Sequence, residues 1–196
     1  MLATIYKLRR DDWKALGLKD RYSIHKAVYS LFPKEDNDER DFLFVEKDGD
    51  WNERNILIIS RRAPALPAFG EIQTKEIPQT FLQWDCYGFE ITLNPTKRDN
   101  STGKITAVRG KEQLSKWFFD KAPSLGFSVD AAGLQISNEG VVRFNKNGSE
   151  CTYNTATFIG KLKVTDRNQF INSFEKGIGR AKGFGFGLLQ LLPLVK

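Results

Sequence analysis

A tyrosine and the only histidine of this 196-residue chain, Tyr22 and His25, lie three residues apart. The surrounding residues, 20–32, have the apolar spacing of a short amphipathic helix, which would place both side chains on one side. Imidazole has an ordinary pKa of about 6.5, so it can accept or donate a proton near neutral pH while the phenol hydrogen-bonds the same substrate. The pair therefore suggests an acid–base site, although a lone histidine on a helix is also typical of a capping or surface residue.

Five glycines fall within eleven residues near the other end of the chain, with two cations between them. Glycine can expose backbone N–H groups to an anion, and Arg or Lys adds charge attraction, so this segment favours binding of phosphate oxygens. A dinucleotide fingerprint would need an acidic residue about 20 positions later, and a P-loop would need Gly-Lys-Ser/Thr, neither of which the sequence contains. A glycine-rich bend that packs a helix on a strand remains the alternative. The candidate phosphate-binding residues are Gly177, Gly179, Arg180, Lys182 and Gly183.

Composition is compatible with a nucleic-acid partner. The net charge is +6, and residues 1–80 carry 14 basic and 14 acidic side chains, whereas residues 81–196 carry 16 and 10. A basic surplus in one half is expected of a protein that binds the phosphate backbone, although many other soluble proteins share it. The sequence has no run of about 20 apolar residues and no apolar N-terminal stretch, so we expect a soluble, cytoplasmic protein without a membrane partner.

Neither a metal nor a cofactor is expected. Cys86 and Cys151 lack the spacing of metal ligands, and one histidine cannot complete a Cys/His zinc cluster. We therefore predict two free thiols.

The pattern of apolar residues predicts an α+β chain with two similar halves, 1–80 and 81–196, because proline and glycine interrupt the pattern just before residue 80. The first half predicts strand 2–9, helix 20–32 and strands 41–47 and 55–60, without an evident second helix. The second half predicts the β-α-β-β-α-β order of a ferredoxin-like domain, with an extra hairpin at Asn147-Gly148. Its predicted elements are strands 87–93, 127–136, 141–145, 155–164 and 184–192, helix 111–122, and helix 166–176 with Asp166 as N-cap.

Five segments carry a resemblance to a known family: Arg21–Pro33, Asp41–Val45, Leu93–Arg98, Gly160–Val164 and Gly177–Leu189. In their order and spacing they resemble the CasE family, CRISPR repeat endoribonucleases of the RAMP superfamily that belong to the type I-E Cascade complex. The similarity extends over essentially the whole chain. Its most specific parts are the glycine-rich loop and the early Tyr-x-x-His motif.

The resemblance implies two tandem ferredoxin-like (RAMP/RRM-like) domains and metal-independent cleavage of precursor CRISPR RNA at the base of the repeat hairpin. It also implies that the enzyme stays on its product and joins other Cascade subunits. Tyr22 and His25 are then the expected catalytic residues, and the expected products are a 2′,3′-cyclic phosphate and a 5′-hydroxyl. The sequence leaves open which of the two is the base. Lys26 receives no catalytic role because its helical direction differs from theirs.

Basic residues of the second half are candidates for gripping an RNA stem through its phosphates. Lys161 and Lys163 are two apart in a predicted strand, so both should project from one face. Each cation taken singly is also typical of a solvated surface. The complete set is Lys97, Arg98, Arg109, Lys111, Arg143, Lys146, Lys161 and Lys163, together with the glycine-loop residues.

Two other functions stay open. A non-catalytic RAMP subunit that only binds CRISPR RNA would keep the basic face but would not need a tyrosine and a histidine together. An enzyme acting on a nucleotide or another phosphate ester could use the glycine loop, but the sequence lacks the acidic or P-loop partners that such enzymes require.

Overall fold

The computed structural model describes residues 1–33, 40–47, 49 and 52–194. They form two compact units. The first comprises residues 1–78 together with two later segments, 144–151 and 182–185, and the second comprises the remaining residues from 79 onward.

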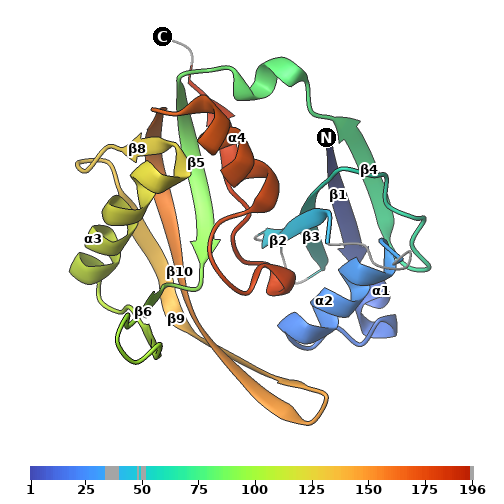
Figure 1. Ribbon diagram of the computed structural model, residues 1–196. Helices are drawn as coiled ribbons and strands as arrows, with labels where there is room; N and C mark the ends of the chain where they lie inside the picture. Colours follow the sequence, from blue (N-terminus) through green and yellow to red (C-terminus); the bar gives the residue numbers. More distant parts are fainter. Residues whose placement is uncertain (34–39, 48, 50–51, 195–196) are drawn as a thin grey trace. The chain divides into compact units, whose positions relative to one another are not determined.

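The first unit is built on an antiparallel sheet in the order β2-β3-β1-β4 (Figure 1). The first and third strands of the unit are central and the second and fourth lie at the edges, which is the ferredoxin-like arrangement. The described residues between β3 and β4 contain no helix, so this unit lacks the second crossover helix. Its elements are β1 (Leu2–Arg9), α1 (Arg10–Ala15), α2 (Arg21–Ser30), β2 (Phe42–Lys47), β3 (Glu53–Ser60) and β4 (Glu71–Glu76).

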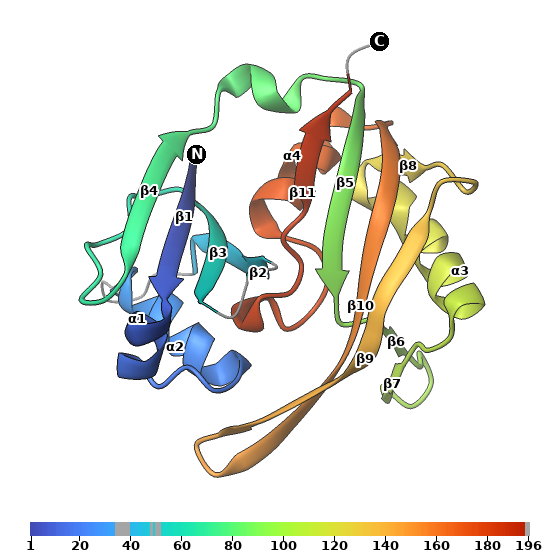
Figure 2. The same cartoon turned by 180° about the vertical axis from the view of Figure 1, so that it is seen from behind.

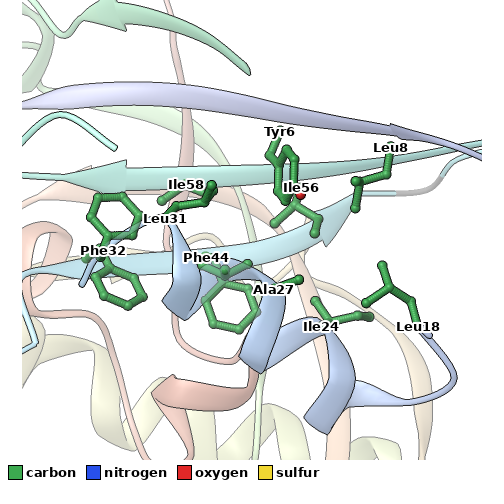
Figure 3. Close-up of a cluster of buried hydrophobic side chains, with 12 residues drawn as sticks. Tyr6, Leu8, Leu18, Ile24, Ala27, Leu31, Phe32, Phe44, Ile56 and Ile58 are labelled. Atoms are coloured by element: carbon green, nitrogen blue, oxygen red, sulfur yellow. The ribbon is translucent and has the colours of Figure 1, made fainter. Parts of the chain in front are cut away.

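Helix α2 begins at a capping box and packs one apolar stripe on the sheet. The Asp20 carboxylate accepts a 2.8 Å hydrogen bond from the Ser23 backbone N–H, and the Ser23 hydroxyl accepts one from the Asp20 N–H. Ile24, Ala27 and Leu31 face the sheet residues Tyr6, Leu8, Ile56 and Ile58 (Figure 3). Because this stripe occupies the i, i+3, i+7 positions, Tyr22, His25 and Tyr29 share a different side of the helix.

The second unit has an antiparallel sheet in the order β11-β5-β10-β8, in which β5 and β10 are central (Figure 2). Strand β9 pairs with β10 outside this order. Both long helices cover one face of this sheet (Figure 1). In the core of this unit the rings of Phe118 and Phe158 stack, and Phe170 packs on Tyr87. Its strands are β5 (Cys86–Leu93), β6 (Thr96–Arg98), β7 (Ile105–Ala107), β8 (Phe127–Val129), β9 (Gln135–Lys146), β10 (Ser149–Val164) and β11 (Gln190–Pro193). Its helices are α3 (Lys111–Lys121) and α4 (Arg167–Lys176), with 3-10 turns at Gln79–Leu82, Ala122–Leu125 and Lys182–Phe184, the last belonging to the first unit.

The structure corrects the expected elements of the first half. Helix α1 and strand β4 are additional, and β4 lies just before residue 80, in the region where proline and glycine interrupt the apolar pattern. Strand β4 forms by pairing with β1, from Leu2 opposite Glu76 to Lys7 opposite Glu71, and most of its side chains are exposed. Since backbone pairing rather than apolar alternation creates this strand, its sequence carries little signal.

The second half differs from prediction in two places. The predicted strand 127–136 stops at Val129, because the Asp130 side chain accepts a hydrogen bond from the Ala132 N–H in a tight turn, and β9 then runs unbroken from Gln135 to Lys146. The predicted strand 184–192 is wrong over most of its length. Gly185 and Gly187 have φ values of +80° and +83°, outside the β region, so pairing begins only at Gln190. The short hairpin β6–β7 was not predicted, whereas the Asp166 cap of α4 is confirmed.

Cys86 and Cys151 are both free, half-buried thiols. No helix in the described part of the chain combines the length and the apolar character needed to cross a membrane.

Candidate active site

Tyr22 and His25 come together on the side of α2 that does not face the sheet. Their rings are stacked, with centroids 5.7 Å apart and an interplanar angle of 16°. Tyr29, one turn further along the helix, lies 3.9 Å from the imidazole centroid, and Phe184 lies 5.1 Å from it. The imidazole is therefore held between aromatic rings on a rigid helix.

A backbone carbonyl fixes the protonation pattern of the imidazole. His25 Nδ1 lies 2.7 Å from the Gly183 carbonyl oxygen, which can only accept a hydrogen bond. Nδ1 therefore carries a proton, and in the neutral ring Nε2 has a free lone pair. This arrangement leaves Nε2 able to take a proton from a substrate.

Close packing rather than a positive φ angle favours glycine at position 183. A methyl group at this position would lie 3.1 Å from the Tyr29 hydroxyl oxygen, 3.3 Å from Arg40 Nη1 and 3.9 Å from His25 Nδ1. A glycine therefore lets the carbonyl reach the imidazole. The sequence predicts Gly183 only as a phosphate-binding candidate.

Burial and positive charge lower the pKa of His25 below its usual value of 6.5. Partial burial is the largest cause, because a charged imidazolium loses hydration. The Gly183 carbonyl raises the pKa, whereas Lys146, Arg40 and Lys26 lower it further. At neutral pH the imidazole is thus predominantly uncharged and can act as a base.

The segment that supplies Gly183 is held within the first unit by the two residues that follow it. Arg21 Nη1 donates a 3.1 Å hydrogen bond to the Phe184 carbonyl oxygen. Gly185 has a positive φ, and a methyl group there would lie 3.2 Å from the Phe44 ring of β2. These contacts with α2 and β2 keep the carbonyl of Gly183 in place beside His25.

The tip of the β9–β10 hairpin, residues 144–151, completes the surroundings of the pair. The Tyr22 hydroxyl donates a 2.9 Å hydrogen bond to Asn147 Oδ1, and the Phe144 ring lies nearly parallel to the Tyr22 ring at 6.4 Å. Lys146 Nζ lies 5.7 Å from the centroid of the Phe184 ring. The hairpin predicted at Asn147-Gly148 is present, and its tip belongs to the same compact unit as α2.

The other predicted RNA-binding cations are exposed on the second unit. Lys161 and Lys163 flank the buried Leu162 on β10, so the expected alternation is confirmed. Lys97 and Arg98 form the outer part of β6, and Arg109 and Lys111 follow its partner β7, so these four gather around one short hairpin. Arg109 donates a hydrogen bond from Nε to Asn154. Arg143 is exposed on β9.

The glycine-rich segment is shared between the two units. Gly177 ends α4 with a φ of +72°, and Gly179, with a φ of +80°, and Arg180 are also assigned to the second unit. Lys182 and Gly183 are assigned to the first unit, where Gly183 meets His25. Of the predicted phosphate-binding set, Lys182 and Gly183 therefore belong to the same unit as the Tyr22–His25 pair.

Several contributing residues were missed from the sequence. Tyr29 could have been found, because it follows His25 by four residues on the same helix. Lys26, for which the sequence predicts no catalytic role, is exposed on α2 with its Nζ 5.2 Å from the Tyr22 ring centroid. Its charge nevertheless lowers the pKa of His25. Arg40 and Asn147 had no sequence signal, because chain folding alone brings them near α2.

Comparisons with known proteins agree with this architecture. The sequence model of the family described as CRISPR associated protein matches residues 4–193. The CRISPR system Cascade subunit CasE of Escherichia coli (strain K12) is 29% identical over 190 residues, covering 90% of this chain and 94% of that protein. The CRISPR-associated endoribonuclease Cse3 of Thermus thermophilus is 28% identical over 115 residues, covering 54% of each chain. A solved structure of CRISPR endoribonuclease Cse3 bound to a 19-nucleotide RNA has a TM-score of 0.83 at 19% identity and covers 98% of this chain and 100% of that one, which shows the same fold.

Proposed function

Since this chain belongs to the CRISPR associated protein family, we propose that it is an endoribonuclease that cleaves precursor CRISPR RNA at the base of the repeat hairpin. In this proposal it then remains on its product and joins the Cascade complex; the name of its relative, Cascade subunit CasE, supports the second of these steps. The observation that carries the proposal is the His25 imidazole, held by the Gly183 carbonyl in one tautomer and stacked on Tyr22.

The proposed reaction uses the RNA's own 2′-hydroxyl as nucleophile. His25 Nε2 removes the proton from the ribose 2′-oxygen, and Tyr22 hydrogen-bonds to the reacting group. The 2′-oxygen attacks the adjacent phosphorus and the bond to the 5′-oxygen breaks, with that oxygen taking up a proton from solvent. The products are a 2′,3′-cyclic phosphate and a 5′-hydroxyl.

Positive charge around the imidazole supports the same reaction. Lys26, Arg40 and Lys146 all lower the pKa of His25, so all three are near enough to act electrostatically on a phosphate beside it. They favour the extra negative charge that develops as the 2′-oxygen attacks. Because an imidazole moves the proton and cations stabilise the charge, we propose that cleavage proceeds without a metal ion.

Grip on the RNA is proposed for the exposed cations of the second unit. Six basic side chains are exposed to solvent there: Lys161 and Lys163 on β10, and the four basic residues around β6–β7. Such contacts recognise phosphates and the shape of a stem rather than its sequence. Arg143, Gly177, Gly179, Arg180 and Lys182 complete the proposed set.

The test is cleavage of a hairpin RNA taken from the repeat of the protein's own CRISPR array. We expect the unmodified RNA to be cleaved in excess EDTA. A substrate with a single 2′-deoxy nucleotide immediately upstream of the scissile phosphate should bind but should not be cleaved. A metal-activated water would give the opposite pattern on both counts. Tight binding without cleavage of any substrate would instead identify a non-catalytic RNA-binding RAMP subunit.

A further inference from the structure

Asn147 lies at the turn of the β9–β10 hairpin, 125 residues from Tyr22 in sequence, yet its side chain meets the phenol. The Tyr22 hydroxyl donates to its Oδ1 at 2.9 Å. Asn147 has a φ of +51° and Gly148 one of +84°, which are the positive values of a two-residue hairpin turn. Asn145 accepts a hydrogen bond from the Gly148 N–H and closes this turn. The turn therefore holds the amide at a fixed place.

This contact limits what the phenol can do. A tyrosine hydroxyl has a single proton, and here that proton is engaged with Asn147, so only the lone pairs of the phenol oxygen are available to a substrate. The same hydrogen bond polarises the phenol oxygen and makes it a better acceptor. A ribose 2′-hydroxyl is a donor that this oxygen can receive.

We propose that Asn147 is a positioning residue for cleavage, which holds the Tyr22 proton so that the phenol oxygen accepts a hydrogen bond from the ribose 2′-hydroxyl. Tyr22 then orients the nucleophile, and the free Nε2 of His25 removes its proton. The parallel Phe144 ring supports the phenol from the same hairpin tip. The inference deepens the proposed function and rests on it.

The decisive variant is Asn147→Gly, because glycine keeps the positive φ while removing the amide. The matched control is Asn138→Gly, at an asparagine with the same φ of +51° on β9 in the second unit. Under single-turnover conditions with saturating enzyme, we expect Asn147→Gly to slow cleavage by about three- to tenfold, the worth of one neutral hydrogen bond. RNA affinity should be unchanged, and Asn138→Gly should cleave like the wild type.

A double-mutant cycle distinguishes positioning from general support of the fold. In a Tyr22→Phe background the Asn147→Gly change should have no further effect, because the hydroxyl it acts through is already gone. The inference would be overturned if Asn147→Gly slowed cleavage equally in both backgrounds. It would also be overturned if this substitution slowed cleavage by less than about 1.5-fold in the wild-type background.

A second measurement does not depend on cleavage. In protein labelled with ¹³C at tyrosine Cζ, the Tyr22 signal should move in Asn147→Gly and stay in place in Asn138→Gly. An unmoved signal would show that the amide does not hold the phenol, whether or not the protein cleaves RNA. Failure of the wild type to cleave would refute the proposed function, and the position of this signal would still decide the contact.

Discussion

Replacing His25 tests the assignment of the base most directly. His25→Ala removes the imidazole, and loss of a positioned base costs about 10²–10⁴-fold in rate. His25→Asn is the matched variant, because its amide can still donate toward the Gly183 carbonyl while offering no base. Both variants should keep RNA affinity within a few-fold, since the phosphate grip is assigned to other residues.

The pH dependence of the wild type gives a sharper magnitude. A pKa below 6.5 leaves more than about three quarters of His25 neutral at pH 7, so the base is already in its active form. Protonation removes that form as the pH falls. A pKa of 6.5 would reduce the neutral fraction about 25-fold between pH 7 and pH 5, so the lowered pKa predicts a smaller loss of rate over this interval.

The assay is single-turnover cleavage with enzyme in excess over RNA but below saturation, from pH 4 to 8, so that the pKa of the free enzyme is observed. The acid limb should have its midpoint below pH 6.5 and should be absent from the residual activity of His25→Asn. Circular dichroism at each pH controls for unfolding. A rate that rises as the pH falls, or near wild-type cleavage by His25→Ala, would refute the reasoning.

Two further predictions concern the cations. Lys146→Gln removes a charge that lowers the pKa of His25, so the acid limb of the pH–rate profile should move to higher pH. The control Lys75→Gln, on the exposed strand β4, should leave the acid limb in place. If Lys146→Gln and the wild type give identical pH–rate profiles, Lys146 does not affect the electrostatics of the site. Replacing Lys161 and Lys163 together by Ala should weaken RNA binding and reduce the slope of log affinity against log salt by about 0.7–0.9 for each phosphate that is no longer neutralised. An unchanged slope, measured by filter binding at several salt concentrations, would show that this strand face does not meet the backbone.

The elements with strong local signals could be predicted from the sequence. Helix α2 was recognisable because its apolar residues repeat with helical spacing, and the same spacing placed Tyr22 and His25 on one side. The α4 cap at Asp166 and the Asn147-Gly148 turn were equally local. Strand β4 was not recognisable, because its exposed polar residues are ordered by pairing with β1.

Glycines account for the error in the last predicted strand. The sequence predicts a strand over 184–192, but Gly185 and Gly187 have positive φ values, so the strand begins only at Gln190. At Gly183 the reason that favours glycine is different, since a methyl group there would lie unusually close to the Tyr29 hydroxyl and to Arg40 Nη1. Sequence alone cannot distinguish a glycine needed for its backbone angle from one needed for the space it leaves.

Residue types and their spacing specify which chemistry the chain can offer: one imidazole, a phenol on the same helical side, and a basic second half. The pKa, the tautomer and the hydrogen bonds of these groups depend on the tertiary structure. The carbonyl that selects the His25 tautomer, the amide that holds the Tyr22 proton and the Lys146 charge come from residues more than 120 positions away. Local periodicity specifies which residues share a helix face, but the tautomer and the pKa depend on burial and on nearby charges, which exist only after distant segments have packed around that face.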